Sequence, residues 1–141
     1  MERQLIGIMT YPCVPAPVGS GIGAKSVVVF DTTTRGNVKL PAATPEKTVA
    51  GVSVDTQDTA GNVAVQYEGI ATCQSDGTAV INPGDWVVVS NALGQVKTQA
   101  LVAGSANVYN IVGQCIDSMQ IPAVAGQFVN IRLSIGPVTA A

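Results

Sequence analysis

The residue types that most often carry catalysis are sparse and scattered in this chain of 141 residues. There is no histidine, so a general base would have to be a carboxylate, a lysine or a tyrosine. The nine acidic residues are dispersed, and five of them stand where a carboxylate is expected to cap a turn: Asp31, Asp55, Asp58, Asp76 and Asp85. A small hydrolase built on two carboxylates brought together by folding stays open as a distant alternative.

Two motifs that suggest chemistry are better explained without it. Ser118-Met119 resembles the start of a Ser/Lys autoprotease site, but Lys97 is the last lysine and precedes the serine, which is the wrong order for that mechanism. The "GSGIG" stretch at residues 19–23 leads into an expected strand and lacks the lysine of a phosphate loop. We therefore expect its glycines to form a hinge: Gly19, Gly21 and Gly23.

The cysteines do not predict a metal site or a disulfide framework. Cys13, Cys73 and Cys115 are odd in number and widely spaced, and no histidine is present to complete a zinc site. No run of acids has the spacing of a calcium loop. We expect three reduced thiols that serve as small apolar residues, assembly in a reducing cytoplasm, and no metal or cofactor.

The composition favours an all-β fold and a surface with few charges. There are 22 valines and 12 threonines against 5 leucines, a balance typical of strands rather than of long helices. Charged residues make up 11% of the chain, whereas a typical domain has about one-quarter. Such a surface suits a protein packed against copies of itself or a large partner, although a monomer coated in Thr, Ser, Asn and Gln is equally compatible.

Charge and hydropathy argue against two classes of partner. The net charge is −2 and the few lysines and arginines do not cluster, so direct nucleic-acid binding is not expected. No apolar run approaches the roughly 18 residues that a membrane-spanning helix needs, and the N-terminus lacks the pattern of a signal peptide. We therefore expect neither nucleic acid nor a membrane as partner.

Short β-branched and aromatic segments separated by turn residues predict a barrel or sandwich over residues 23–141. Residues 78–82 and 99–108 are too short for stable helices, and no internal repeat stands out. The expected strands cover residues 26–30, 37–40, 49–54, 62–67, 69–73, 86–90, 95–98, 111–116 and 128–133.

Two further segments have local signals of their own. Residues 1–22 combine an apolar piece with alternating prolines, which predicts an extended arm, while an ordinary edge strand of the same domain is the alternative. Pro83-Gly84-Asp85 is expected to be a turn that starts a strand. Trp86, the first residue of that strand, is then expected in the core or at a subunit interface.

The order of these features resembles the small capsid decoration, or cement, proteins of tailed bacteriophages over roughly residues 20–135. The ordered elements are "VAGVSVDTQDTAGNVAVQYEGIA", "DGTAVINPGDWVVVSNALGQVKT", "IVGQCIDSM" and "GQFVNIRL". The resemblance implies a small β-barrel or β-tulip-like domain with an extended N-terminal arm, forming a homotrimer on the outside of an icosahedral head. It implies no catalytic residue and no cofactor.

The same resemblance implies that the arm contacts the major capsid protein by adding a strand to one of its sheets. The arm residues expected to bind are Leu5, Ile6, Ile8, Met9 and Tyr11. The protein would be made in the host cytoplasm and would reside on the virion capsid surface. The main alternative is a β-sandwich carbohydrate-binding or adhesin module that recognises a surface glycan.

Overall fold

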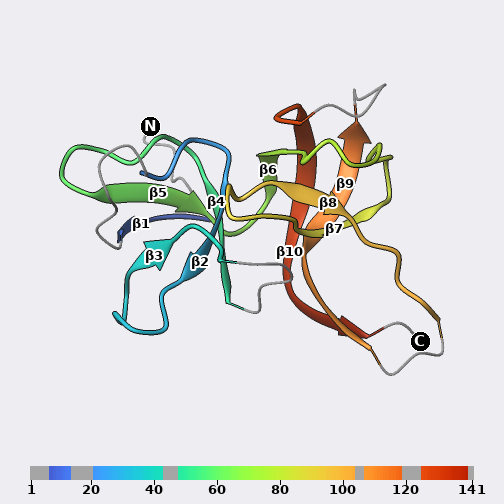
Figure 1. Cartoon of the computed structure of the whole chain (residues 1–141), viewed down its shortest axis with the longest axis horizontal. Helices are drawn as coiled ribbons and strands as arrows, with labels where there is room; N and C mark the ends of the chain where they lie inside the picture. The colour runs from blue at the N-terminus through green and yellow to red at the C-terminus, as the bar shows by residue number, and fades with distance from the viewer. Residues whose placement is uncertain (1–6, 14–20, 43–47, 104–106, 119–124, 140–141) are drawn as a thin grey trace, which may run out of the picture.

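The computed structural model describes residues 7–13, 21–42, 48–103, 107–118 and 125–139. These residues form ten β-strands and no helix, which confirms the expected all-β, barrel-like class. The strands lie in two antiparallel five-stranded sheets that stand side by side (Figure 1). Their bounds are β1 (Ile8–Pro12), β2 (Val27–Phe30), β3 (Val38–Lys39), β4 (Val49–Ser53), β5 (Asn62–Gln66), β6 (Ile70–Gln74), β7 (Trp86–Val89), β8 (Val96–Thr98), β9 (Val108–Ser118) and β10 (Phe128–Thr139).

Each sheet curls until its two edges meet. The first sheet has the order β1-β5-β4-β2-β3, and a parallel bridge between Cys13, just after β1, and Val38 of β3 joins its edges. The second sheet has the order β6-β10-β9-β7-β8, and a parallel bridge between Ser75, just after β6, and Val96 of β8 does the same. Both orders read 1-5-4-2-3 when the strands of each sheet are numbered from its own start. The chain therefore consists of two topologically identical halves, here called the N-terminal half (β1–β5) and the C-terminal half (β6–β10).

The equivalence extends to the pairing of individual residues. Ile8 of β1 lies opposite Gln66 of β5, and Ile70 of β6 lies opposite Arg132 of β10. When the two halves are aligned by their strand pairing, short stretches are also similar in sequence, such as "GIMTYPC" with "GIATCQS" and "VAGVSVDT" with "IVGQCIDS". Further pairs equated by the same ladders are Val28 with Val87, Phe30 with Val89, Val38 with Val96, Gly51 with Gly113 and Val65 with Ile131. The sequence-based statement that no internal repeat stands out was therefore wrong.

The repeat was hidden because its connections differ in length. The spacing between equivalent residues is 58 at Val38 and Val96 (96 − 38) and 66 at Val65 and Ile131 (131 − 65), so no fixed period exists. Few equivalent positions are identical, because many different β-branched residues satisfy a buried strand position. Only the strand ladders bring the two halves into register.

The turn that enters β7 shows how one backbone geometry is encoded twice. Gly84 has a φ of 94°. The equivalent residue before β2 is Lys25, with a φ of 60°, and among the described residues no other non-glycine residue has a positive φ. The backbone N–H of Gly84 donates to the carbonyl of Cys115 in β9, and the backbone N–H of Lys25 donates to the carbonyl of Ser53 in β4. The prediction that residues 83–85 form a turn launching a strand is confirmed.

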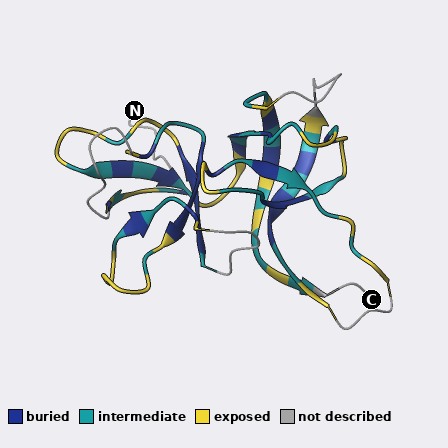
Figure 2. Cartoon of the chain, in the orientation of Figure 1, coloured by how far each residue is buried: buried dark blue, intermediate teal, exposed yellow. Residues whose placement is uncertain are grey.

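Two clusters of buried side chains form the core, and Figure 2 shows buried segments along strands of both sheets. The N-terminal cluster fills the curl of the first sheet and consists of Cys13, Ile22, Val28, Val38, Ala50, Val63 and Val65. The larger cluster, here called the junction cluster, combines side chains of both halves: Val27, Val29, Val49, Val52, Ala71, Cys73, Ile81, Val87, Val89, Val96, Val112, Cys115, Val129 and Ile131. The two halves are thus fused through one shared core.

All nine strands expected from the sequence are present, but two are longer than expected. β9 and β10 extend beyond the curl of the second sheet as a two-stranded ribbon in which Gly136 lies opposite Ile111. Irregularities in their register fall between Asn130 and Ile131 and between Leu133 and Gly136. Such bulges bend a ribbon, and this bend carries Ile135 back against the core.

The structure corrects the expectation that residues 1–22 form an arm separate from a domain at 23–141. Residues 8–12 are strand β1, which pairs along its length with β5. Cys13 and Ile22 are buried in the N-terminal cluster, so they belong to the domain. An edge strand of the same domain, the alternative drawn from the sequence, describes residues 7–13. Residues 1–6 and 14–20 lie outside the described residues.

The hinge expected at the glycines is likewise corrected where the structure describes it. Ile22, between Gly21 and Gly23, is 3% exposed. Its backbone N–H donates to Gln57 Oε1 at 3.1 Å, and its carbonyl accepts from the backbone N–H of Gln57 at 2.8 Å. These contacts fasten Gly21 and Gly23 to the domain. Gly19 lies outside the described residues.

Candidate functional site

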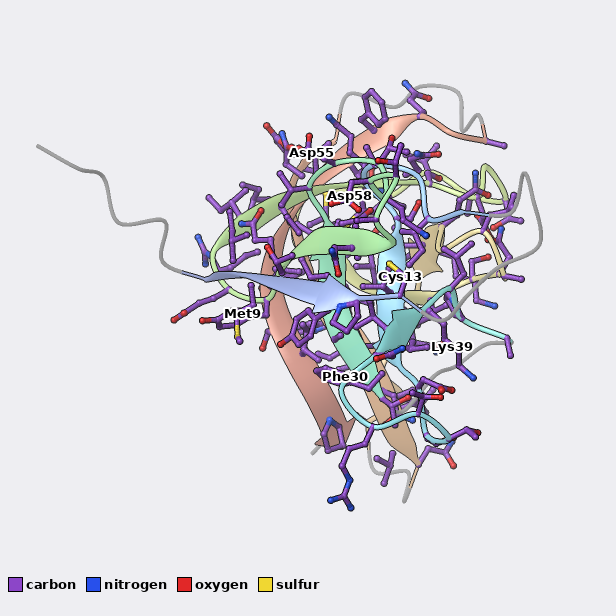
Figure 3. The ribbon with its side chains drawn as sticks, turned by 90° about the vertical axis from the view of Figure 1, so that its left-hand side faces the viewer. Met9, Cys13, Phe30, Lys39, Asp55 and Asp58 are labelled. Atoms are coloured by element: carbon purple, nitrogen blue, oxygen red, sulfur yellow. The ribbon has the colours of Figure 1, made fainter. Side chains whose placement is uncertain are left out.

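An apolar groove of about 300 Å³ opens beside β1 and is the best candidate for a binding site. It lies where the first sheet curls, between β1 and β2, and the ribbon of β10 closes one side. In Figure 3 the labelled Met9 and Phe30 lie on the same side of β1. The residues lining it are Met9, Tyr11, Phe30, Val49, Ala50, Tyr67 and Ile135.

Large side chains remain exposed in this groove. Met9 is 49% exposed, Tyr67 is 41% exposed and Phe30 is 38% exposed. The Tyr11 ring packs edge-on against Phe30, with centroids 5.6 Å apart and planes at 82°, so the wall is preformed. None of the lining side chains carries a charge, which suits the groove for an apolar partner rather than for an ionic ligand.

The equivalent positions of the C-terminal half are closed. The counterparts of Met9, Tyr11 and Phe30 are Ala71, Cys73 and Val89, all of which are buried in the junction cluster. The counterpart of Tyr67 is Leu133, as the backbone N–H groups of both donate to a glycine carbonyl that precedes the first strand of their half. Leu133 packs against the same cluster. Side chains at the groove are therefore exposed, whereas those at the equivalent site of the C-terminal half are buried.

The arm residues predicted from the sequence fall partly in this groove. Met9 and Tyr11 line it, whereas Ile8 points to the other face of β1 and is half-buried. Leu5 and Ile6 lie outside the described residues. Phe30 and Tyr67 were missed because their residue types and positions in expected strands indicated core packing. Ile135 was missed because it lies beyond the strand expected at residues 128–133.

Trp86 lies at the start of β7 and is partly buried. It faces Gln114 of β9, which is also partly exposed and whose Nε2 donates to the carbonyl of Gly84 at 2.8 Å. Trp86 is absent from both core clusters. This partial exposure does not match the expected place in the core, and the other expected place, a subunit interface, stays a prediction.

Three of the aspartates that the structure describes hold turns together. Asp58 Oδ1 accepts from the backbone N–H of Asn62 at 2.8 Å, and Asp85 Oδ2 accepts from that of Asn82 at 2.9 Å. Asp31 Oδ2 accepts from the backbone N–H of Thr34 at 2.7 Å, and this bond, aided by an ion pair with Lys39, holds the pKa of Asp31 below its ordinary value. The turn role predicted for these three residues is confirmed.

Asp76 is the most constrained of the carboxylates. It accepts a short hydrogen bond from the Ser90 hydroxyl and two bonds from Thr78, one from the backbone N–H and one from the hydroxyl. Burial raises the pKa of Asp76, but these bonds and the charge of Lys97 outweigh burial and hold the pKa below its ordinary value. A carboxylate tied in this way joins the β6–β7 connection to the end of β7.

All three cysteines are free and buried. Burial raises the pKa of Cys73 to about 12, with Cys115 nearby adding to the shift. Burial also raises the pKa of Cys13 and Cys115. The thiols therefore stay protonated and behave as apolar core residues, as the sequence indicated.

A second, polar hollow of about 150 Å³ lies where the halves meet, but its polar groups are already engaged. The Ser53 hydroxyl donates to the carbonyl of Gly23 at 2.6 Å, and Thr72 Oγ1 donates to Asn130 Oδ1 at 2.8 Å. The Lys25 ammonium lies 5.0 Å from the centre of the Phe128 ring. Of these contacts, the one between Lys25 and Phe128 joins the two halves.

Other kinds of site find no support in the part of the chain that the structure describes. No group of three or more His, Cys, Asp or Glu side chains gathers there in a way that could hold a metal ion. Within the same residues no helix is long and apolar enough to cross a bilayer. Comparison with protein-family models finds no match, and comparison with functionally characterised proteins finds none either.

Proposed function

We propose that this chain is a capsid decoration protein of a tailed bacteriophage, which binds the outside of an icosahedral head as a homotrimer and stabilises the shell. The observation that carries the proposal is the exposure of large apolar side chains at separate places on a protein with few charges. Met9 and Tyr67 lie at the groove, whereas Val108 and Phe128 belong to the C-terminal half. A subunit that contacts both its own copies and a shell needs more than one such surface.

The N-terminal segment is the proposed contact with the major capsid protein. Among the described residues, strand β1 pairs along its length with β5, and its other edge meets β3 at a single bridge between Cys13 and Val38. An edge of this kind can receive an extended strand of a partner. Residues Leu5 and Ile6, which precede β1, extend the same contact in the proposal. Three such contacts on one trimer bind as a unit, so a weak single contact suffices for firm attachment.

In this proposal the protein acts without catalysis and without a cofactor, at the virion surface, after synthesis in the host cytoplasm. The partners are the major capsid protein and two further copies of the chain, without direct contact to nucleic acid or to a membrane.

The test is attachment of the purified protein to heads of its phage that lack it. Wild-type protein should co-sediment with mature heads and raise the temperature at which they rupture. A variant lacking residues 1–6 should stay folded and bind far more weakly. A folded wild-type protein that fails to co-sediment would sink the proposal.

A carbohydrate-binding or adhesin module is the second candidate, because two aromatic rings, Tyr67 and Trp86, are accessible to a planar sugar face. In that case soluble glycans should change the fluorescence of Trp86 in a saturable way. The decoration proposal expects the fluorescence to change on self-association and to be indifferent to glycans.

A further inference from the structure

We propose that the apolar groove of one copy is covered by the surface around Trp86 and Gln114 of the next copy. This head-to-tail contact repeats, between chains, the contact that joins the two halves within one chain. The inference deepens the proposed function, since it rests on the proposed self-association, but it does not depend on binding to a shell.

The first step of the argument is that the groove is an unfilled member of an equivalent pair. In the C-terminal half, Ala71, Cys73 and Val89 are at most 2% exposed. Their counterparts in the groove include Met9 and Phe30, which are large and exposed. Because the side chains at the groove are larger, a partner that covers the groove would remove more apolar area from water.

The second step identifies what covers the filled site. The buried C-terminal positions share the junction cluster with Val27, Val29 and Val52, which project from β2 and β4 of the N-terminal half. One face of strands β2 and β4 in the N-terminal half thus covers the open side of the curled second sheet. This contact joins two different surfaces, so it is heterologous in the sense used for subunits.

The third step finds the same surface on the C-terminal half. The counterparts of Val27 and Val52 are Trp86 and Gln114, because both pairs face each other between the same two equivalent strands. Trp86 and Gln114 are partly exposed, whereas Val88, the counterpart of Val29, is already buried. The surface left for a second copy is therefore a partly exposed aromatic ring beside an uncharged amide.

The two surfaces are compatible in size and charge. A groove of about 300 Å³ lined by uncharged side chains can receive an indole ring, and the charged neighbour of Gln114 in the ladder, Arg132, is exposed to solvent. One groove and one Trp86 surface per chain allow each copy to contact two neighbours. Copies that repeat such a contact by rotation close into a ring, and a ring of three chains contains six equivalent halves.

The mass of the protein in solution tests the contact. Tyr67→Glu places a charge in the groove and should convert the trimer to a monomer, with unchanged circular dichroism. Leu93→Glu is the matched control, because Leu93 is 65% exposed in the β7–β8 turn and outside the groove. It should leave the trimer intact. A wild-type protein that stays monomeric at high micromolar concentration overturns the inference, as does a folded Tyr67→Glu protein that keeps its threefold mass.

Site-directed cross-linking tests which surfaces meet and does not require a charged variant to fold. Met9→Cys protein mixed with Gln114→Cys protein should form a disulfide-linked dimer on mild oxidation, while Met9→Cys mixed with Leu93→Cys should not. Equal yields in both mixtures, or none in the first, overturn the inference. If the cross-link forms but the protein does not attach to heads, the proposed function fails and the contact between copies stands.

Discussion

Gly51 and Gly113 occupy the same place in the two halves of the molecule, each pressed against the backbone of the next strand in its sheet. A side chain at Gly51 would collide with the carbonyl oxygen of Gln66, and one at Gly113 with that of Arg132. Gln66 and Arg132 are themselves equivalent, so one packing constraint has been kept twice along the chain. The identity of these glycines follows from close approach of two backbones.

Alanine at either glycine should destabilise the fold to a similar degree. Overpacking of a tight contact costs about 1 to 3 kcal/mol, and backbone collisions fall at the upper end of that range. Chemical denaturation of Gly51→Ala and Gly113→Ala measures both. Gly23→Ala is the control, since an added Cβ meets nothing within 4 Å and φ is not positive there. A loss at one glycine alone would contradict the equivalence of the halves.

Two N-terminal truncations should distinguish the contribution of strand β1 to stability from that of the residues before it. Removal of residues 1–6 leaves β1 paired and should change the melting temperature little. Removal of residues 1–13 strips the edge of β5 and takes Cys13 and Tyr11 out of the N-terminal cluster. The melting temperature should therefore fall by roughly 2 to 4 °C for each kcal/mol lost. Equal melting temperatures would show that β1 contributes nothing to the fold.

Ile22 and Ile81 offer a second test of the repeat, since each precedes the second strand of its half and is buried in its core. Each alanine variant should lose about 2 to 5 kcal/mol in the free energy of unfolding.

Trp86→Ala should cost the monomer less than the 3 to 5 kcal/mol typical of a buried tryptophan, because its ring is partly exposed. Urea titrations at a concentration where the protein is monomeric give all three values.

Asp76 should make the stability of the protein depend on pH. Its folded pKa lies below its ordinary value of 3.8, so the carboxylate stabilises the folded state above its unfolded pKa, and this contribution is lost as the pH falls through the folded pKa. Asp76→Asn should therefore cost most at neutral pH, and the difference from wild type should shrink below about pH 4. Removal of the donor in Ser90→Ala should reduce the effect of Asp76→Asn in a double-mutant cycle. A difference that stays constant between neutral and acid pH would contradict this role.

The cysteines should be inert while the protein is folded. A buried Cys73 with a pKa of about 12 contains almost no thiolate near neutral pH, and Cys13 and Cys115 are shifted in the same direction. A thiol reagent at pH 8 should modify none of the three in native protein and all three in denaturant. Rapid labelling of a single thiol in native protein would identify a cysteine that the fold leaves accessible.

What the sequence determined by itself was local. The ratio of valine and threonine to leucine predicted an all-β fold, and turn residues such as Gly84 and Asp85 marked where strands begin, because strand propensity and turn geometry depend on residues close together in the chain. The buried state of the cysteines followed from their type and spacing.

The tertiary structure alone decided which strands pair, and with them the internal repeat and the place of residues 7–13 in the domain. β1 lies beside β5, 50 to 58 residues away in the chain (62 − 12 and 66 − 8), so no local pattern could show that it belongs to the domain. The same holds for Met9, Phe30 and Tyr67. Phe30 and Tyr67 were expected in strands and hence in a core, and Met9 was expected in an arm, yet all three are exposed on the folded domain. The surface that covers the equivalent site in the other half comes from a neighbour in space rather than in sequence.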